Sequence, residues 1–137
     1  MENQKLVAEG AGAVPVAAAL FHKLPIEGKK VVCVISGGNI DVNILSRVIT
    51  RGLVMSGRKA NLTIALEDKP GQLQRVAEIV SRCGSNVVSV LHDGSDPNMP
   101  ISSCFLKLTL ETRDAVQIEQ IRAELTKEGF QLVSERV

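Results

Sequence analysis

One short segment combines the residue types of a small-molecule site: Asp68-Lys69-Pro70-Gly71 follows an alternating apolar stretch and precedes a helical pattern. Pro70 presets φ for a first helical turn, and Gly71 lets another group approach the backbone closely. The Asp68 carboxylate can accept hydrogen bonds from the free amides of that turn. A small polar ligand suits such a turn, but the same residues also cap helices that bind nothing, so both interpretations stay open.

A second turn with glycines lies in the first part of the chain. The apolar run 29–35 is typical of a strand buried on both faces, Ser36-Gly37-Gly38-Asn39 follows it, and we expect a helix to begin near Asp41. A strand, a turn and a helix in this order expose backbone N–H groups that suit an anion or a ring acceptor. Paired glycines are also common in tight turns without ligands, so this motif is equally open on its own.

Periodicity predicts the elements that position the first turn. Alternating or short apolar segments predict strands at residues 62–66, 86–91, 101–111 and 130–133. Helical spacing follows the first turn up to Gly84 and again between Asp114 and Gly129, where Asp114 with Gln117 resembles a capping box. The order βαββαβ predicts an α+β fold, the ferredoxin-like split unit, with an antiparallel sheet and two helices on one face.

Composition excludes several function classes. A net charge of +1 and 2% aromatic residues, with no Trp or Tyr, provide neither a basic stripe nor a stacking platform, so we expect no nucleic-acid partner. No apolar run approaches the length that spans a bilayer, and the first residues do not resemble a signal peptide. We therefore expect a cytoplasmic protein that does not enter membranes.

The cysteines and histidines show no spacing typical of a metal site. Cys33, Cys83 and Cys104 fall in a predicted strand, helix and strand, which favours buried free thiols. His22 and His92 have no ligand-type neighbour along the chain, and His92 is placed in a loop that runs to residue 100. The sequence therefore predicts no metal ligand.

Four ordered motifs in the second part of the chain resemble those of a known module. They are Asp68-Lys69-Pro70-Gly71-Gln72-Leu73, Gly84-Ser85-Asn86-Val87-Val88, Leu108-Thr109-Leu110-Glu111-Thr112 and Gly129-Phe130. With them, residues 58–137 resemble an ACT domain, a small module that senses amino acids. The resemblance implies an effector site where the first βα turn meets the sheet of a second chain. Its implied residues are Asp68, Pro70, Gly71, Gln72 and Leu73, with Asn86, Val87 and Val88.

The first part of the chain resembles a different family. The segments 9–13, 28–32 and 35–41 are similar to the end of the catalytic domain of threonine dehydratase, a fold-type II enzyme that uses pyridoxal phosphate. In that family the serine at the position of Ser36 hydrogen-bonds the pyridine nitrogen, and Gly37, Gly38 and Asn39 would shape the wall beside the ring. A hydroxyl partner suits elimination of water better than a full electron sink. Residues 1–57 are thus expected to be an α/β remnant of the catalytic domain.

The two resemblances lead to one preferred function and two alternatives. The family's Schiff-base lysine segment and glycine-rich phosphate cradle do not occur here, so we expect a C-terminal fragment with no catalytic residue, no activity and no bound cofactor of its own. It would regulate threonine deamination, in isoleucine biosynthesis, by binding isoleucine or valine. We also expect a homodimer or larger oligomer, paired through residues 86–91. The alternatives are a free-standing ACT-type amino-acid-binding protein and a small phosphate-binding α/β protein.

Overall fold

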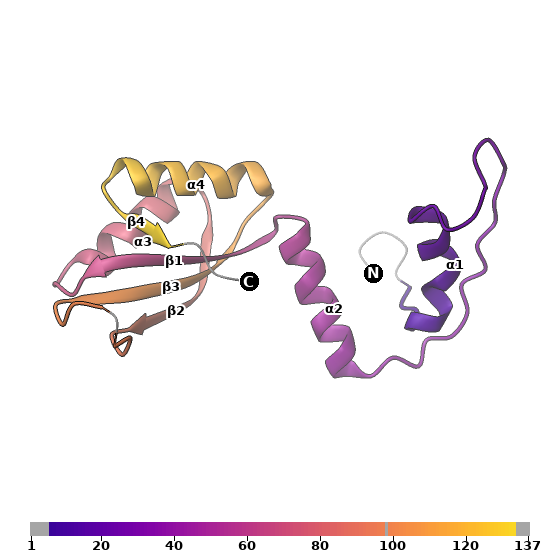
Figure 1. Ribbon diagram of the computed structural model, residues 1–137, viewed down its shortest axis with the longest axis horizontal. Coiled ribbons are helices and arrows are strands. Elements are labelled where there is room, and N and C mark those ends of the chain that lie inside the picture. The colour runs from indigo at the N-terminus through magenta and orange to yellow at the C-terminus, as the bar shows by residue number, and fades with distance from the viewer. Residues whose placement is uncertain (1–5, 98, 134–137) are drawn as a thin grey trace. The chain divides into compact units, whose positions relative to one another are not determined.

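The structure is a computed structural model, which describes residues 6–97 and 99–133. The chain forms two units, residues 1–48 and 49–137, and each is described by itself. The second unit carries the sheet (Figure 1). Its elements are, in chain order, β1 (Lys59–Glu67), α3 (Gln72–Arg82), β2 (Asn86–Asp93), β3 (Ser103–Glu111), α4 (Ala115–Lys127) and β4 (Gln131–Val133).

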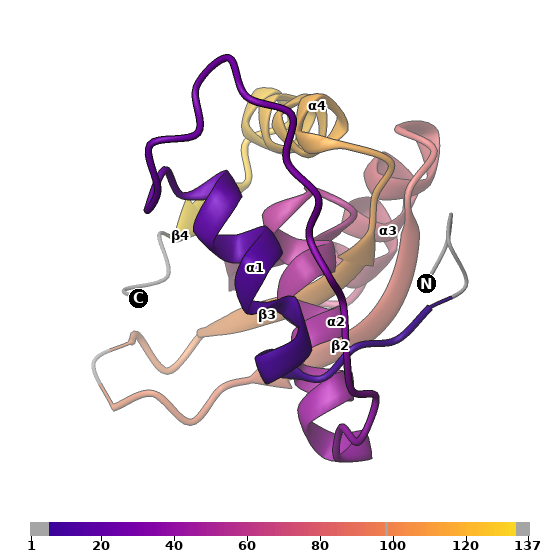
Figure 2. The same ribbon diagram turned by 90° about the vertical axis from the view of Figure 1, so that its right-hand side faces the viewer.

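The sheet of the second unit has the strand order β2-β3-β1-β4, and every neighbouring pair is antiparallel. Both helices lie on one face of it, as Figures 1 and 2 show from two directions. The predicted α+β fold of ferredoxin-like βαββαβ topology is therefore confirmed. β2 is an edge strand, and its pairing with β3 shifts register between Val87 and Ser89.

The core of this unit follows from the alternation of the two central strands, which only the buried Thr63 of β1 interrupts. Every second residue of β1 and β3 points to the helices, and α3 and α4 each add an apolar stripe. The buried cluster contains Leu62, Ile64, Leu66, Val76, Ile79, Val80, Cys104, Leu106, Leu108, Leu110, Ile121, Leu125 and Phe130. The opposite face of β3 carries Lys107 and Glu111, both exposed, as the alternation predicts.

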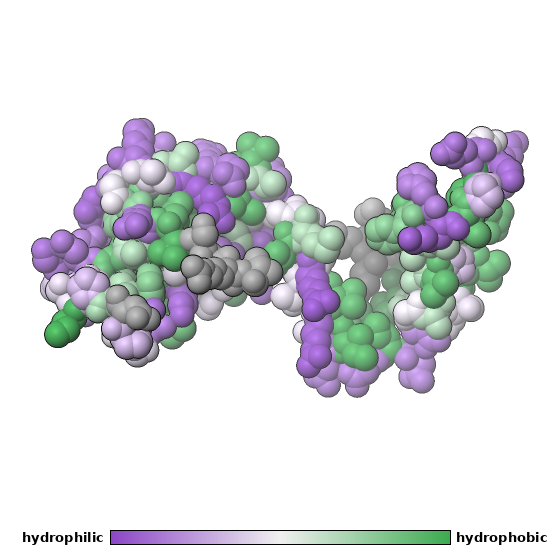
Figure 3. All heavy atoms as spheres, viewed as in Figure 1, coloured by the Kyte–Doolittle hydropathy of each residue, from purple (hydrophilic) through white to green (hydrophobic). Residues whose placement is uncertain are grey.

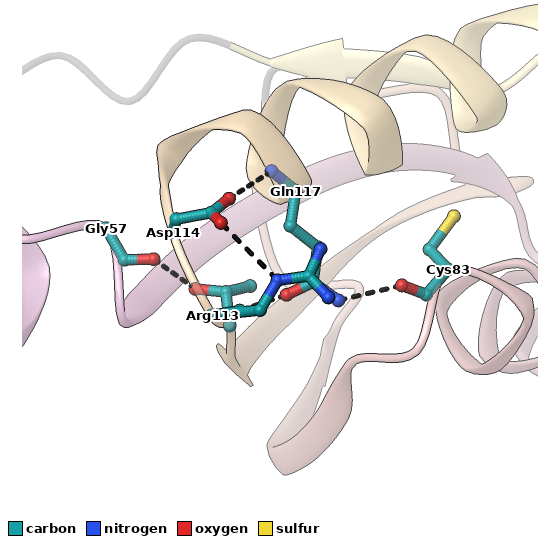
Figure 4. A network of polar contacts seen from close by, with 6 residues as sticks. Gly57, Cys83, Arg113, Asp114 and Gln117 are labelled. Atoms are coloured by element: carbon teal, nitrogen blue, oxygen red, sulfur yellow. Dashed lines mark hydrogen bonds and ion pairs between the residues drawn. The ribbon is translucent and has the colours of Figure 1, made fainter.

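A polar network fixes the start of α4 (Figure 4). The Asp114 side chain accepts a hydrogen bond from the Gln117 amide at 2.8 Å, which confirms the Asp114 half of the predicted capping box. The reciprocal bond goes to the residue before the cap, because the Gln117 side-chain oxygen accepts from the Arg113 amide at 2.7 Å. The Gln117 side-chain nitrogen then donates to the Cys83 carbonyl at 2.7 Å, and this bond links α4 to the end of α3.

The first unit contains α1 (Gly10–Leu20), and α2 (Val42–Met55) runs from it into the second unit. α2 begins as predicted, because the Asp41 carboxylate accepts from the amides of Asn43 and Ile44 at 2.8 and 3.2 Å. Apolar side chains gather along one flank of α2 and polar ones along the other (Figure 3). No helix in the described ranges has both the length and the hydropathy to cross a bilayer.

The strand expected at residues 29–35 does not form. These residues have no strand pairing, and Val32 and Val34 are 90% and 72% exposed. A strand of this apolar type needs a neighbour on each side for its backbone N–H and C=O groups. Among the described residues of the first unit there is no second strand to supply them, so the run stays extended and unpaired.

Candidate functional site

A cavity of about 210 Å³ lies at the turn between β1 and α3. Its lining consists of residues 66–73 with His92, Cys104 and Leu106. The side chains of Leu66, Cys104 and Leu106 form a buried, largely apolar floor. The side chains of Asp68 and His92 stand at the rim and are 57% and 55% exposed. An apolar floor beneath a few polar groups is the usual composition of a small-molecule site.

The backbone of the β1–α3 turn leaves the start of α3 open. The Asp68 amide donates to the Ser102 carbonyl at 2.8 Å, which fixes the end of β1 against the loop before β3. Gly71 is the N-cap residue, and it has a φ of +89°, a conformation that side chains with a Cβ rarely adopt. No side chain caps α3, and the Gln72 amide makes only a long hydrogen bond of 3.5 Å to the Lys69 carbonyl, so a ligand can still bind at the first turn of this helix.

The structure contradicts one expectation about this turn. The Asp68 carboxylate does not cap α3, because Gly71 occupies the cap position and carries no side chain. A Cβ built at Gly71 would meet nothing within 4 Å, so the space beside this glycine is open, and the approach of another group to its backbone stays a prediction. The positive φ of Gly71 favours glycine at this position, and the Asp68 side chain lies at the cavity instead.

Two acidic groups of the turn have different surroundings. Lys69 Nζ lies 2.6 Å from Glu67 Oε2, and this hydrogen-bonded pair lowers the pKa of the Glu67 carboxyl. Asp68 Oδ1 instead lies 3.5 Å from His92 Nε2. The interpretation that His92 has no ligand-type neighbour is therefore wrong, and His92 belongs to β2 rather than to the following loop. Asp68 and His92 together give the rim one carboxyl and one imidazole group.

Cys104 forms the polarisable part of the floor. Its side chain is nearly inaccessible to solvent, and burial, together with the negative charge of Asp68, raises the pKa of the thiol. The thiol is therefore protonated at neutral pH. The Sγ of Cys104, a carboxylate oxygen of Asp68 and a ring nitrogen of His92 all lie within 4.8 Å of one another. These three residues are the group in the described part of the chain that could hold a metal ion.

The structure does not bring all the predicted effector residues together in one chain. Asp68, Pro70, Gly71, Gln72 and Leu73 line the cavity, but Asn86, Val87 and Val88 do not. Asn86 pairs with Glu111 at one end of β3, and its side chain donates to the Glu111 carboxylate at 3.1 Å. The cavity lies at the other end, where Glu67 pairs with Ser103, on the order of 27 Å away along the strand.

The predicted cofactor residues lie in the first unit, against the start of α1. The Glu9 amide donates to the Gly37 carbonyl at 3.1 Å. A Cβ at Gly12 would lie 1.7 Å from the Ser36 carbonyl oxygen, so only glycine permits this close contact. Ser36, Gly37, Gly38 and Asn39 are all exposed. A serine hydroxyl beside two residues without side chains fits one edge of a flat heteroaromatic ring.

Comparisons with known proteins relate the chain to one group of enzymes. It is 48% identical over 132 residues to an L-threonine ammonia-lyase of Thermotoga maritima. The matched region covers 96% of this chain and 33% of the relative. A second L-threonine ammonia-lyase, from Geobacter sulfurreducens, is 40% identical over 95% of this chain and 32% of its own length. The chain thus spans about a third of the curated relatives it matches, and the resemblance to threonine dehydratase is confirmed.

The other comparisons add little. No protein-family model matches the chain. A similar solved structure is the ACT domain from a GTP pyrophosphokinase of Chlorobium tepidum, with a TM-score of 0.42 and 15% identity over 55% of this chain and 96% of that domain.

Proposed function

This chain is a homologue of L-threonine ammonia-lyases, and on that premise we propose that it is the C-terminal regulatory portion of such an enzyme. Residues 58–137 would be an ACT-type domain that binds an amino acid, and residues 1–57 would be the end of the catalytic domain. The whole protein would deaminate L-threonine with pyridoxal phosphate. The fold and the location of the cavity support this assignment.

The single observation that carries the sensing role is the cavity at the β1–α3 turn. The Asp68 carboxylate at its rim can hold the ammonium group of an amino acid through a charge-assisted hydrogen bond. The first turn of α3, which no side chain caps, can receive the carboxylate, because its N–H groups lie at the positive end of the helix dipole. Leu66, Leu73 and Leu106 then offer an apolar surface to the side chain, which favours isoleucine or valine.

A second copy of the chain would complete the site. β2 is an edge strand, so its outer N–H and C=O groups are free to pair with another strand. If two copies of β2 pair antiparallel about their midpoint, Asn86 of one copy lies opposite Asp93 of the other and next to its His92. The end of the sheet that carries residues 86–88 would thereby reach the cavity of the other chain. The homodimer is proposed for this reason.

Residues 36–39 would contribute one wall of the pyridoxal phosphate site in the whole protein. The exposed Ser36 hydroxyl would hydrogen-bond the pyridine nitrogen, and Gly37 and Gly38 would leave room for the ring. The cofactor supplies the electron withdrawal for elimination of water, and the chain supplies the position of the ring nitrogen. The alternative of a small phosphate-binding α/β protein is not favoured, because the described residues of the first unit contain no strand.

Calorimetric titration with isoleucine, valine, threonine and serine tests the sensing role. We expect isoleucine or valine to bind, and Asp68→Ala to weaken binding by about 1–3 kcal/mol, which is the value of a hydrogen bond to a charged group. Asn86→Ala should have a comparable effect if the second copy completes the site. Asn61→Ala is the matched control, since Asn61 is exposed on β1 and does not line the cavity.

The possible results separate the parts of the proposal. No binding of any of the four amino acids at millimolar concentration would overturn the sensing role. Unchanged affinity in Asn86→Ala, with reduced affinity in Asp68→Ala, would reject only the contribution of the second copy.

A further inference from the structure

Three elements bring different metal-ligand types to one point of the second unit. Asp68 follows β1, His92 lies near the end of β2, and Cys104 lies at the start of β3. We propose that these three side chains form a binding site for a thiophilic divalent cation, with Zn²⁺ as the preferred ion. The site is separate from the residues proposed for pyridoxal phosphate, but it shares Asp68 and the cavity with the proposed amino-acid site.

The distances are close to those that a zinc ion imposes. Tetrahedral bonds of about 2.0–2.3 Å to sulfur, nitrogen and oxygen place the ligand atoms roughly 3.4–3.6 Å apart. The Asp68 Oδ1 and His92 Nε2 atoms are already 3.5 Å apart. The widest pair of the three ligand atoms is no more than 4.8 Å apart, so a contraction of about 1 Å completes the set.

The mobility of the three residues suits this contraction. Cys104 is held by the core cluster, so its Sγ is a fixed point. The side chains of Asp68 and His92 are more than half exposed, so rotation about their side-chain bonds brings them toward the thiol without repacking the core. An ion can therefore bind to the fixed thiol of Cys104 while the side chains of Asp68 and His92 move to complete its coordination.

The ligand chemistry selects the kind of ion. A thiolate and an imidazole favour Zn²⁺ and similar metals over Mg²⁺ and Ca²⁺, which prefer oxygen ligands. Three protein ligands leave the fourth tetrahedral position open toward the cavity, where water can occupy it. The other two cysteines do not share the site, because neither Cys33 nor Cys83 lines the cavity.

Metal binding must remove the proton of the Cys104 thiol. Burial and the charge of Asp68 raise the pKa of this thiol, so the free chain holds the proton at neutral pH. Glu67 and Lys69 of the neighbouring turn form their own ion pair and do not take part in the site.

The test uses the full chain, dialysed against chelator and titrated with Zn²⁺ in the absence of amino acids. We expect one equivalent per chain, and Co²⁺ in its place should give the charge-transfer absorption of a cobalt–thiolate bond. Cys104→Ser and His92→Ala should each weaken zinc binding at least tenfold and remove that absorption or shift it. Cys83→Ser is the matched control and should bind like the wild type.

Because Cys104 is buried, the folding of Cys104→Ser is checked by circular dichroism. His92 is exposed, so His92→Ala tests zinc binding independently of the core. Absence of stoichiometric zinc binding would overturn the proposal, and so would binding that both substitutions leave unchanged. Since no amino acid is present, a negative result would leave the sensing role untouched, and a positive one would not establish it.

Discussion

Gln117 offers the sharpest test of how the two helices of the second unit are held together. Its side chain is 3% exposed and makes two hydrogen bonds of 2.7 Å, one to the Cys83 carbonyl and one from the Arg113 amide. Gln117→Ala removes both. The free energy of unfolding should fall by about 3 kcal/mol, of which about 1 kcal/mol belongs to each bond and the rest to the buried methylene and the unsatisfied carbonyl.

Thermal and urea unfolding followed by circular dichroism measure this loss. A change of that size lowers the Tm of a domain of this length by roughly 12–24 °C. Gln120→Ala is the matched control, because Gln120 is exposed on the same helix and its substitution should change stability by less than about 0.5 kcal/mol. If Gln117→Ala is no more destabilising than Gln120→Ala, the bridge between α3 and α4 does not stabilise the fold.

A second substitution isolates the bond to Cys83. Gln117→Glu keeps the oxygen that accepts from Arg113 but directs a carboxylate at the Cys83 carbonyl at neutral pH. The helix N-terminus stabilises a negative charge by only about 0.3–1 kcal/mol, which is less than the stability lost when the carboxylate faces the Cys83 carbonyl. The new carboxyl thus has a raised folded-state pKa, so its proton stabilises the fold below the ordinary glutamate pKa. The deficit of this variant should shrink as the pH falls toward 4 and grow as it rises to 7.

Two further predictions concern the site and the assembly. Gly71→Ala should lower the free energy of unfolding by about 1–2 kcal/mol through its positive φ, whereas Gly10→Ala, in open space within α1, should not; equal effects in urea titrations would contradict the assigned backbone strain. Light scattering at micromolar concentration should show a dimer or larger species, and a monomer would reject the pairing through β2.

The parts of the fold that depend on local pattern were predictable from the sequence. β3 alternates strictly and β1 does so except at Thr63, so their periodicity predicts both the strands and the buried face. The glycines after α3 and α4 have the positive φ that their position predicts. Capping of α4 by Asp114 was predictable for the same reason, because the partner amide lies only three residues away.

The parts that depend on long-range register were not predictable. The cavity joins residues 68, 92 and 104, which no sequence spacing relates, and only the pairing of three strands brings them together. The run 29–35 has the composition of a buried strand, but its state depends on neighbours that the described first unit does not contain. The composition of a segment predicts its preference for a strand, but the strand forms only where neighbouring strands can pair with it.

The register shift in β2 determines which residue enters the cavity. Before the shift Val87 lies opposite Leu110, whereas after it His92 lies opposite Leu106. The extra residue therefore changes which positions of β2 point to the helices, from odd numbers to even ones. Without it, Leu91 would take the place opposite Leu106, and the imidazole would turn to the other face of the sheet. The one extra residue in β2 thus places His92, rather than Leu91, in the cavity wall.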